Sequence, residues 1–177
     1  MQSDLKIAFI GGGNMAQAML GGLVGKLTKP ADIHVVDVMP ETLASLHQRF
    51  GVTTAEGPSV ALADAQVWVL AVKPQQMRAV VASVKPYLEG QLVISIAAGI
   101  RAADLSRWLG GHQALVRTMP NTPALIGLGI TGAFAMPGVS EFQQQSADAM
   151  LRAVGETVWV TDESHLDAVT AISGSGP

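Results

Sequence analysis

Three small residues near the amino terminus form the pattern with the clearest chemical meaning. Gly11, Gly13 and Ala16 spell G-x-G-x-x-A between a short apolar run and an amphipathic helical pattern. In a strand-turn-helix unit, the first glycine permits a tight turn, the second lets a pyrophosphate approach the backbone, and the third small residue brings helix and strand together. Glycines also occur in ordinary tight turns, so the pattern favours dinucleotide binding while a purely structural turn stays open.

The residues around this turn are the first candidate contacts of a cofactor. Asn14 is placed to cap the helix that follows, and the unpaired N–H groups of its first turn would face phosphate oxygens. Met15 begins the apolar stripe of that helix. We expect cofactor contacts from Ile10, Gly11, Gly12, Gly13, Asn14, Met15 and Ala16.

An acidic residue follows the second apolar run. Asp37 closes residues 33–36, about twenty residues after the glycine turn, where a carboxylate can bind both ribose hydroxyls of an adenosine. No lysine or arginine follows closely to bind a 2′-phosphate, so charge favours NADH over NADPH. The alternative is that Asp37 merely ends a strand.

Later strand ends carry weaker candidates. Lys73, within Ala71, Val72, Lys73 and Pro74, could hold an anion or could simply be a solvated charge. Ala97, Ala98 and Gly99 are small enough for a flat ring to lie against the backbone, although small residues also serve close packing. Asn121 offers a donor and an acceptor from a loop bounded by two prolines.

The order of patterns predicts the elements that position these residues. Apolar runs at 5–10, 33–36, 52–55, 67–72, 91–95 and 114–118 are expected strands, and helical patterns occupy 40–50, 59–63, 75–84 and 101–109. This alternation indicates an α/β fold with a doubly wound, mostly parallel, Rossmann-like sheet. Strands at 129–136 and 157–160, flanking a helix at 141–154, have short connections that favour antiparallel pairing at the edge.

Composition limits the remaining classes of function. The chain has 177 residues, is 49% hydrophobic and 14% charged, and has a formal net charge of -3, so nothing favours a nucleic-acid partner. It has no cysteine, and its four histidines are far apart, so we expect no metal site. The first apolar run is too short to span a membrane. A cytoplasmic protein with a small-molecule substrate fits these features.

Five motifs in this order resemble the Δ1-pyrroline-5-carboxylate reductases of proline biosynthesis: IGGGNMA, AVKP, SIAAGI, MPNTPA and DAVTAISGSGP. The resemblance implies reduction of the C=N bond of 1-pyrroline-5-carboxylate to L-proline by NADPH or NADH, without a metal. It also implies that Gly11 to Ala16 hold the pyrophosphate and Ala71 to Pro74 line the cofactor. Ala97 to Gly99 and Asn121 would lie by the nicotinamide.

The resemblance also identifies candidates near the substrate and a domain boundary. These candidates are Met119, Pro120, Ser173, Gly174 and Ser175. Residues 1–164 would form the dinucleotide-binding domain, and residues 165–177 would begin a helical domain that completes the substrate pocket and a homo-oligomer. Because this sequence stops at Pro177, we expect the chain alone to bind cofactor with little turnover.

Two residues depart from the family pattern. Many members carry a small or basic residue where this chain has Asp37, and many have an asparagine or serine near the position of Pro58. We expect no general acid, because a cyclic imine protonates easily and its iminium form accepts hydride directly.

Two other functions stay open for this sequence. One is another NAD(P)-dependent reductase of similar scaffold, such as a β-hydroxyacid dehydrogenase, and the other is a non-catalytic dinucleotide-binding module.

Overall fold

One eight-stranded sheet forms the centre of the computed structural model, which describes residues 5–119 and 129–166. The strand order is β3-β2-β1-β4-β5-β6-β7-β8. The strands are β1 (Ile7–Ile10), β2 (Ile33–Val36), β3 (Thr53–Ala55), β4 (Val67–Leu70), β5 (Leu92–Ser95), β6 (Leu115–Met119), β7 (Gly129–Ala135) and β8 (Gly155–Val160). Strands β1 through β6 pair in parallel, which confirms the doubly wound sheet.

The last two strands correct one expectation. Strand β7 is antiparallel to β6, as the sequence indicates, but β8 is parallel to β7. The chain between β7 and β8 contains α6 (Glu141–Leu151) and a 3-10 turn, η4 (Arg152–Val154). These elements form a crossover, and a crossover permits parallel pairing where a hairpin does not. Strands β7 and β8 therefore both run opposite to β1 through β6.

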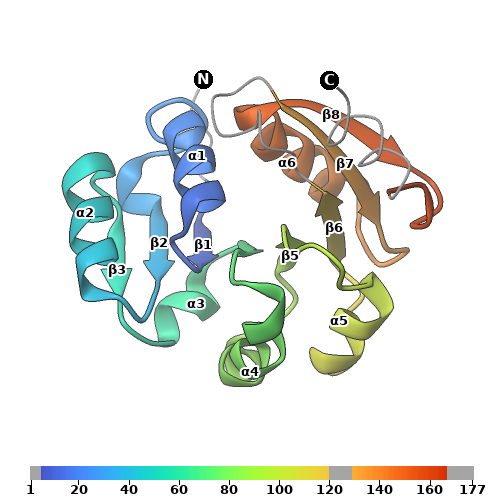
Figure 1. Ribbon diagram of the computed structural model, residues 1–177, viewed down its shortest axis with the longest axis horizontal. Coiled ribbons are helices and arrows are strands. Elements are labelled where there is room, and N and C mark those ends of the chain that lie inside the picture. Colours follow the sequence, from blue (N-terminus) through green and yellow to red (C-terminus); the bar gives the residue numbers. More distant parts are fainter. Residues whose placement is uncertain (1–4, 120–128, 167–177) are drawn as a thin grey trace.

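Helices cover both faces of the sheet, as Figure 1 shows, with α1 and α6 above the strands and α4 and α5 below them. Helices α1 (Asn14–Leu23), α2 (Pro40–Phe50) and α6 pack on one face. Helices α3 (Val60–Asp64), α4 (Pro74–Val84) and α5 (Ala102–Trp108) pack on the other. Two further 3-10 turns, η1 (Pro30–Asp32) and η2 (Lys85–Tyr87), complete the regular structure of the described residues.

This two-sided cover explains the uninterrupted apolar strands. Along β1, Ile7 and Phe9 face the α1 side, and Ala8 and Ile10 face the α4 side, because successive side chains point to opposite faces. All four residues are buried. A strand covered on both faces needs apolar residues at every position, which is why the sequence pattern of β1 is continuous rather than alternating.

Helix α2 shows how local sequence sets the bounds of a helix beside the candidate site. Pro40 occupies its first turn, and Gly51 ends it in the left-handed conformation with φ of 75°. Leu43 and Leu46 are buried against the sheet. Each such burial contributes about 1.5–3 kcal/mol, so packing rather than intrinsic propensity holds this helix in place.

The predicted cap of α1 is wrong. Gly13 is the N-cap, Asn14 is the first helical residue, and no side chain caps this end. Further along, α1 passes very close to η4: a Cβ on Gly22 would meet the backbone oxygen and Cβ of Ala153. Within residues 5–119 and 129–166, no helix has the length and apolar character needed to cross a membrane.

Candidate functional site

The glycine turn after β1 has a geometry that requires glycine at its first position. Gly11 has a φ of 106°, and a Cβ there would lie 2.7 Å from the backbone oxygen of Ala71. The Gly11 N–H donates to Val36 O at 2.8 Å, and the Ala71 N–H donates to Ile10 O at 2.8 Å. The carboxyl ends of β1, β2 and β4 are therefore held together at this turn.

Gly12 and Gly13 are glycines for different reasons. A Cβ on Gly12 would lie 2.8 Å from Leu46 Cδ1, so this residue allows α2 to pack against the turn. Gly13 has no atom within 4 Å of a Cβ position, and its φ of -75° suits any residue. Since neither packing nor backbone conformation requires glycine there, the open space above Gly13 fits the close approach of a ligand to the uncapped start of α1.

Asp37 contacts the glycine turn directly. Its Oδ2 accepts a hydrogen bond from the Gly12 N–H at 2.8 Å, and its Oδ1 accepts one from the Met39 N–H at 2.9 Å. These two bonds fix the plane of the carboxylate. A carboxylate has about four acceptor positions, so both oxygens can still accept from hydroxyl groups.

A groove of about 440 Å³ opens at the carboxyl ends of β1, β2 and β4. Strand β1 lies between β2 and β4, which is the topological switch point where ligands of doubly wound folds bind. Helix α4 forms the other wall, and most of the lining is apolar. The lining residues are Ile10, Gly11, Val36, Asp37, Val38, Glu56, Pro58, Val72, Gln75, Gln76, Ala79, Val80, Ser83 and Val84.

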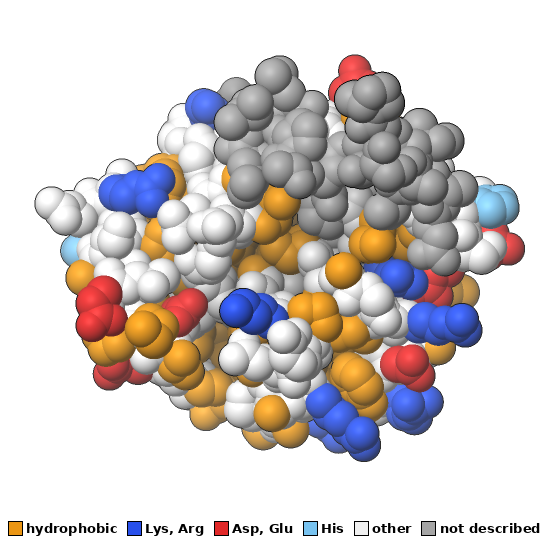
Figure 2. Space-filling view, viewed as in Figure 1, with side chains coloured by type: hydrophobic (Ala, Val, Ile, Leu, Met, Phe, Trp, Pro, Cys, Tyr) orange, Lys and Arg blue, Asp and Glu red, His pale blue; other side chains and the backbone are white. Residues whose placement is uncertain are grey.

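The charged groups of this groove are both acidic. Asp37 and Glu56 are the only ionisable side chains among its described lining residues. Glu56 directly follows β3, and the Asp37 N–H donates to Ala55 O at 3.2 Å, so the two carboxylates belong to neighbouring strand ends. Figure 2 shows acidic side chains together at the left, over the part of the molecule that carries α2 and α3. A ribose suits this charge better than a 2′-phosphate does.

The other predicted cofactor contacts differ in position. Val72 lines the groove, whereas Lys73 is the exposed N-cap of α4 and is absent from the lining. Ala97 is buried in the core, so its side chain is not presented to a ligand. Ala98 and Gly99 are exposed just beyond β5, and Gly99 has a φ of 78°.

Among the substrate-side candidates, the described part of the chain contains Met119, which is half-buried at the end of β6. The other candidates, together with one predicted cofactor contact, lie outside the described residues: Pro120, Asn121, Ser173, Gly174 and Ser175. The structure therefore brings together the glycine turn, Asp37 and Val72, and places Ala98 and Gly99 at the same sheet edge.

Sequence reasoning missed Glu56 and the face of α4 that lines the groove. The signal for Glu56 was its place immediately after an expected strand, at the same sheet edge as Asp37. The signal on α4 was the spacing of Gln76, Ala79, Val80 and Ser83, which repeats every three or four residues.

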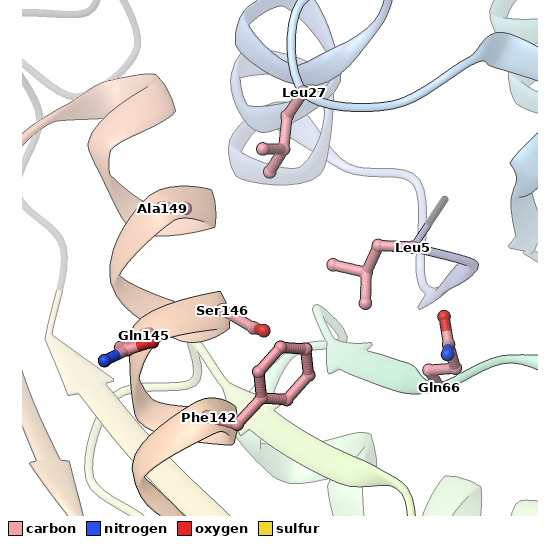
Figure 3. A pocket seen from close by; sticks show the side chains of 7 residues that line it. All are labelled: Leu5, Leu27, Gln66, Phe142, Gln145, Ser146 and Ala149. Carbon is pink, nitrogen blue, oxygen red and sulfur yellow. The ribbon is translucent and has the colours of Figure 1, made fainter. Parts of the chain in front are cut away.

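A second hollow of about 350 Å³ lies at the opposite edge of the sheet, where β1 and β4 begin (Figure 3). Its described lining has no ionisable side chain, and the Phe142 ring from α6 points across it toward Leu5. The lining residues are Leu5, Leu27, Gln66, Phe142, Gln145, Ser146 and Ala149. Ribose hydroxyls would find no carboxylate there, so the groove at the carboxyl edge, which has Asp37 in its lining, is the better candidate.

Comparison with known proteins agrees with this assignment of the sheet edge. The family model described as "NADP oxidoreductase coenzyme F420-dependent" matches residues 6–99. The chain is 47% identical over 176 residues to the pyrroline-5-carboxylate reductase of Pseudomonas aeruginosa, an alignment that covers 99% of this chain and 64% of that relative. The chain thus spans about two thirds of the length of that protein.

Solved structures of such reductases also match this chain over nearly its whole length. A pyrroline-5-carboxylate reductase from Coxiella burnetii matches with a TM-score of 0.94 and 38% identity, covering 99% of this chain and 66% of that one. Plasmodium falciparum pyrroline carboxylate reductase with NADP bound matches with a TM-score of 0.85 and 25% identity, covering 100% of this chain and 65% of that one. Because the family model matches more than half of its residues, this chain belongs to the family of NADP oxidoreductases described as coenzyme F420-dependent, and within it resembles the pyrroline-5-carboxylate reductases.

Proposed function

We propose that this chain is the dinucleotide-binding part of a reductase that converts 1-pyrroline-5-carboxylate to L-proline with NADH or NADPH. The observation that carries the proposal is its 47% identity to a pyrroline-5-carboxylate reductase over 99% of the chain. The groove beside Gly11 and Asp37 supports it independently, because its shape and its position at the switch point suit the adenosine half of such a cofactor.

The two halves of the cofactor use different residues in this proposal. Gly13 and the first turn of α1 receive the pyrophosphate, and Asp37 accepts hydrogen bonds from the ribose. Ala98 and Gly99 lie against the nicotinamide, while Ile10, Gly12, Asn14, Met15, Ala16 and Val72 support the turn around the cofactor. When bound, the reduced nicotinamide supplies a hydride to the carbon of the C=N bond.

The protein's task in this reaction is orientation rather than acid-base chemistry. A protonated cyclic imine accepts hydride without a further acid, so the residues need to align two rings and exclude water. Met119, Pro120, Asn121, Ser173, Gly174 and Ser175 remain our candidates for the substrate side.

We further propose that this chain uses NADH at least as well as NADPH. Asp37 and Glu56 would both repel a 2′-phosphate, and the described lining of the groove has no lysine or arginine to bind one. The relative from Plasmodium falciparum has NADP bound, so this preference would distinguish the present chain from that protein.

The remaining parts of the proposal concern the whole protein. Residues 1–164 form the dinucleotide-binding domain, and residues 165–177 lead into a helical domain that contributes to the substrate pocket and to a homo-oligomer. We also propose a cytoplasmic location, which is compatible with a biosynthetic role. Since the relatives are longer than this chain, the 177 residues alone should retain cofactor binding better than turnover.

The test is an assay of the protein that carries this chain. Loss of reduced nicotinamide that depends on 1-pyrroline-5-carboxylate, with proline identified by mass spectrometry, is the expected result. A 3-hydroxy acid with oxidised cofactor serves as the comparison substrate, because it probes another reductase on a similar scaffold. Oxidation of the hydroxy acid without consumption of the imine would overturn the proposal, and cofactor binding with neither activity would favour a non-catalytic module.

A further inference from the structure

Arg117 and Glu163 form a largely buried ion pair that joins distant parts of the chain. Arg117 lies on β6 with its side chain 8% exposed, and its Nη1 donates to Glu163 Oε2 at 2.8 Å. Glu163 follows β8, and the same Oε2 accepts a hydrogen bond from the Ala102 N–H at 2.7 Å. One carboxylate oxygen therefore holds both a central strand and the first residue of α5.

This contact fixes one end of the loop between β5 and α5. The other end is held by Ser95, whose Oγ accepts from the Ala97 N–H at 3.3 Å. Residues 97–99 thus lie on a loop anchored at its start by its own strand and at its end by Glu163. The second anchor comes from a residue 61 positions later in the chain.

Separating Arg117 from Glu163 would be electrostatically unfavourable. Glu163 is the acidic partner of a guanidinium that is almost out of water, and Arg117 Nε has no hydrogen-bond partner among residues 5–119 and 129–166. Removing one member of a buried pair leaves an uncompensated charge. The carboxylate is therefore confined to the place from which it contacts Ala102.

We propose that Glu163 is a positioning residue for the nicotinamide half of the cofactor and acts through residues 97–99. This inference rests on the proposed function, which places Ala98 and Gly99 against the nicotinamide. In this proposal Glu163 acts without direct contact with cofactor or substrate: it holds the start of α5 and so determines where this loop ends. A small displacement of a surface that orients a reacting ring reduces the gain from orientation.

The experiment compares two ligands that differ only at the nicotinamide end. NADH carries the nicotinamide, whereas ADP-ribose has the adenosine, both phosphates and the second ribose without it. Isothermal titration of the protein gives both dissociation constants. A residue with a purely structural role would change both affinities equally or neither, while a positioning role changes their ratio.

Three variants separate the contacts. Glu163→Ala removes the bond to Ala102 and is expected to weaken NADH binding about fivefold while ADP-ribose stays within about twofold. Arg117→Met leaves Glu163 free to keep its bond to Ala102, so its loss should be smaller. Glu156→Ala, which removes an exposed carboxylate on β8, is the matched control and should change neither constant.

The outcomes distinguish this inference from the proposed function. If the parent binds both ligands and Glu163→Ala keeps the parental ratio, the positioning role is refuted and the proposed function stands. If the parent binds neither ligand, the proposed function falls and the inference falls with it. Should Glu163→Ala not fold, Glu163→Asp keeps the charge but withdraws it from Ala102, and a parental ratio there overturns the inference.

Discussion

The carboxylate of Asp37 accepts a hydrogen bond from the backbone N–H of Gly12 at 2.8 Å, although the two residues are 25 positions apart. Parallel pairing of β1 with β2 brings their carboxyl ends together and makes this contact. A second bond, from the Met39 N–H, fixes the carboxylate plane before any ligand arrives. A group held in one orientation loses less conformational freedom on binding, so the arrangement would favour a ribose in this groove.

Cofactor preference should depend on the two acidic residues of the groove. Asp37→Ser is expected to weaken NADH binding and to shift the NADPH-to-NADH affinity ratio about tenfold toward NADPH, because it removes both a ribose partner and a repulsive charge. Glu56→Gln should strengthen NADPH binding and leave NADH unchanged. Titration of each cofactor by fluorescence measures both effects.

The control for these variants is Glu141→Gln, which removes an exposed charge from the start of α6. It should leave the ratio unaltered. An unchanged ratio in Asp37→Ser would mean that Asp37 serves only to hold the glycine turn.

Gly13 should be needed for binding but not for folding. A Cβ at this position meets no neighbouring atom within 4 Å, yet a valine side chain would occupy the space through which a pyrophosphate approaches the backbone. Gly13→Val is therefore expected to reduce NADH affinity by at least about tenfold, which corresponds to about 1.4 kcal/mol, while the poorer N-cap lowers the free energy of unfolding by about 1 kcal/mol and the protein still folds. Equal affinity in the parent and in Gly13→Val would show that the pyrophosphate lies elsewhere.

The adjacent glycines of α1 should respond oppositely to alanine. A Cβ on Gly21 meets no atom within 4 Å, so Gly21→Ala should stabilise the protein by up to about 1 kcal/mol through helix propensity. A Cβ on Gly22 would collide with Ala153, and Gly22→Ala should destabilise it by about 1–3 kcal/mol. Urea unfolding of both variants provides the comparison. Two stabilised proteins would contradict the close approach of α1 to η4.

The stability of the fold should fall in mild acid because of His34. Burial lowers the pKa of this imidazole from its usual 6.5, so the folded state resists protonation. The unfolded chain then binds more protons as pH falls below 6.5, and the free energy of unfolding decreases until the folded-state pKa is passed.

His34→Asn tests this expectation because it removes the titration and retains a polar group near Thr53 Oγ1, which lies 2.7 Å from His34 Nδ1. Thermal melts between neutral pH and pH of about 5 should show a smaller decrease for the variant than for the parent. Parallel pH profiles would exclude a contribution from His34.

Local patterns predicted much of the fold because local physics determines those features. Burial on both faces makes β1 and β4 continuous apolar runs, and Pro40 and Pro74 mark helix starts at positions that proline tolerates. The position of Asp37 directly after β2 was also predictable, because the apolar run that precedes it marks the strand. The direction of β7 was also correct.

Other features depend on contacts between distant segments. Gly12 is small because Leu46 lies beside it, and Glu56 joins the groove because β3 pairs with β2. The Arg117–Glu163 pair joins residues 46 positions apart, and no local spacing marks it. Asn14 matched a capping preference, yet Gly13 takes that place.

The most direct test of the account is to map NADH binding on the amide NMR spectrum of the protein. At saturation, we predict the largest shifts at Gly11, Gly13, Asp37 and Gly99, at the carboxyl edge of the sheet. Phe142, in the second hollow, should not respond. No saturable shift with NADH or NADPH, or shifts centred on Phe142 instead, would contradict the assignment of the dinucleotide site.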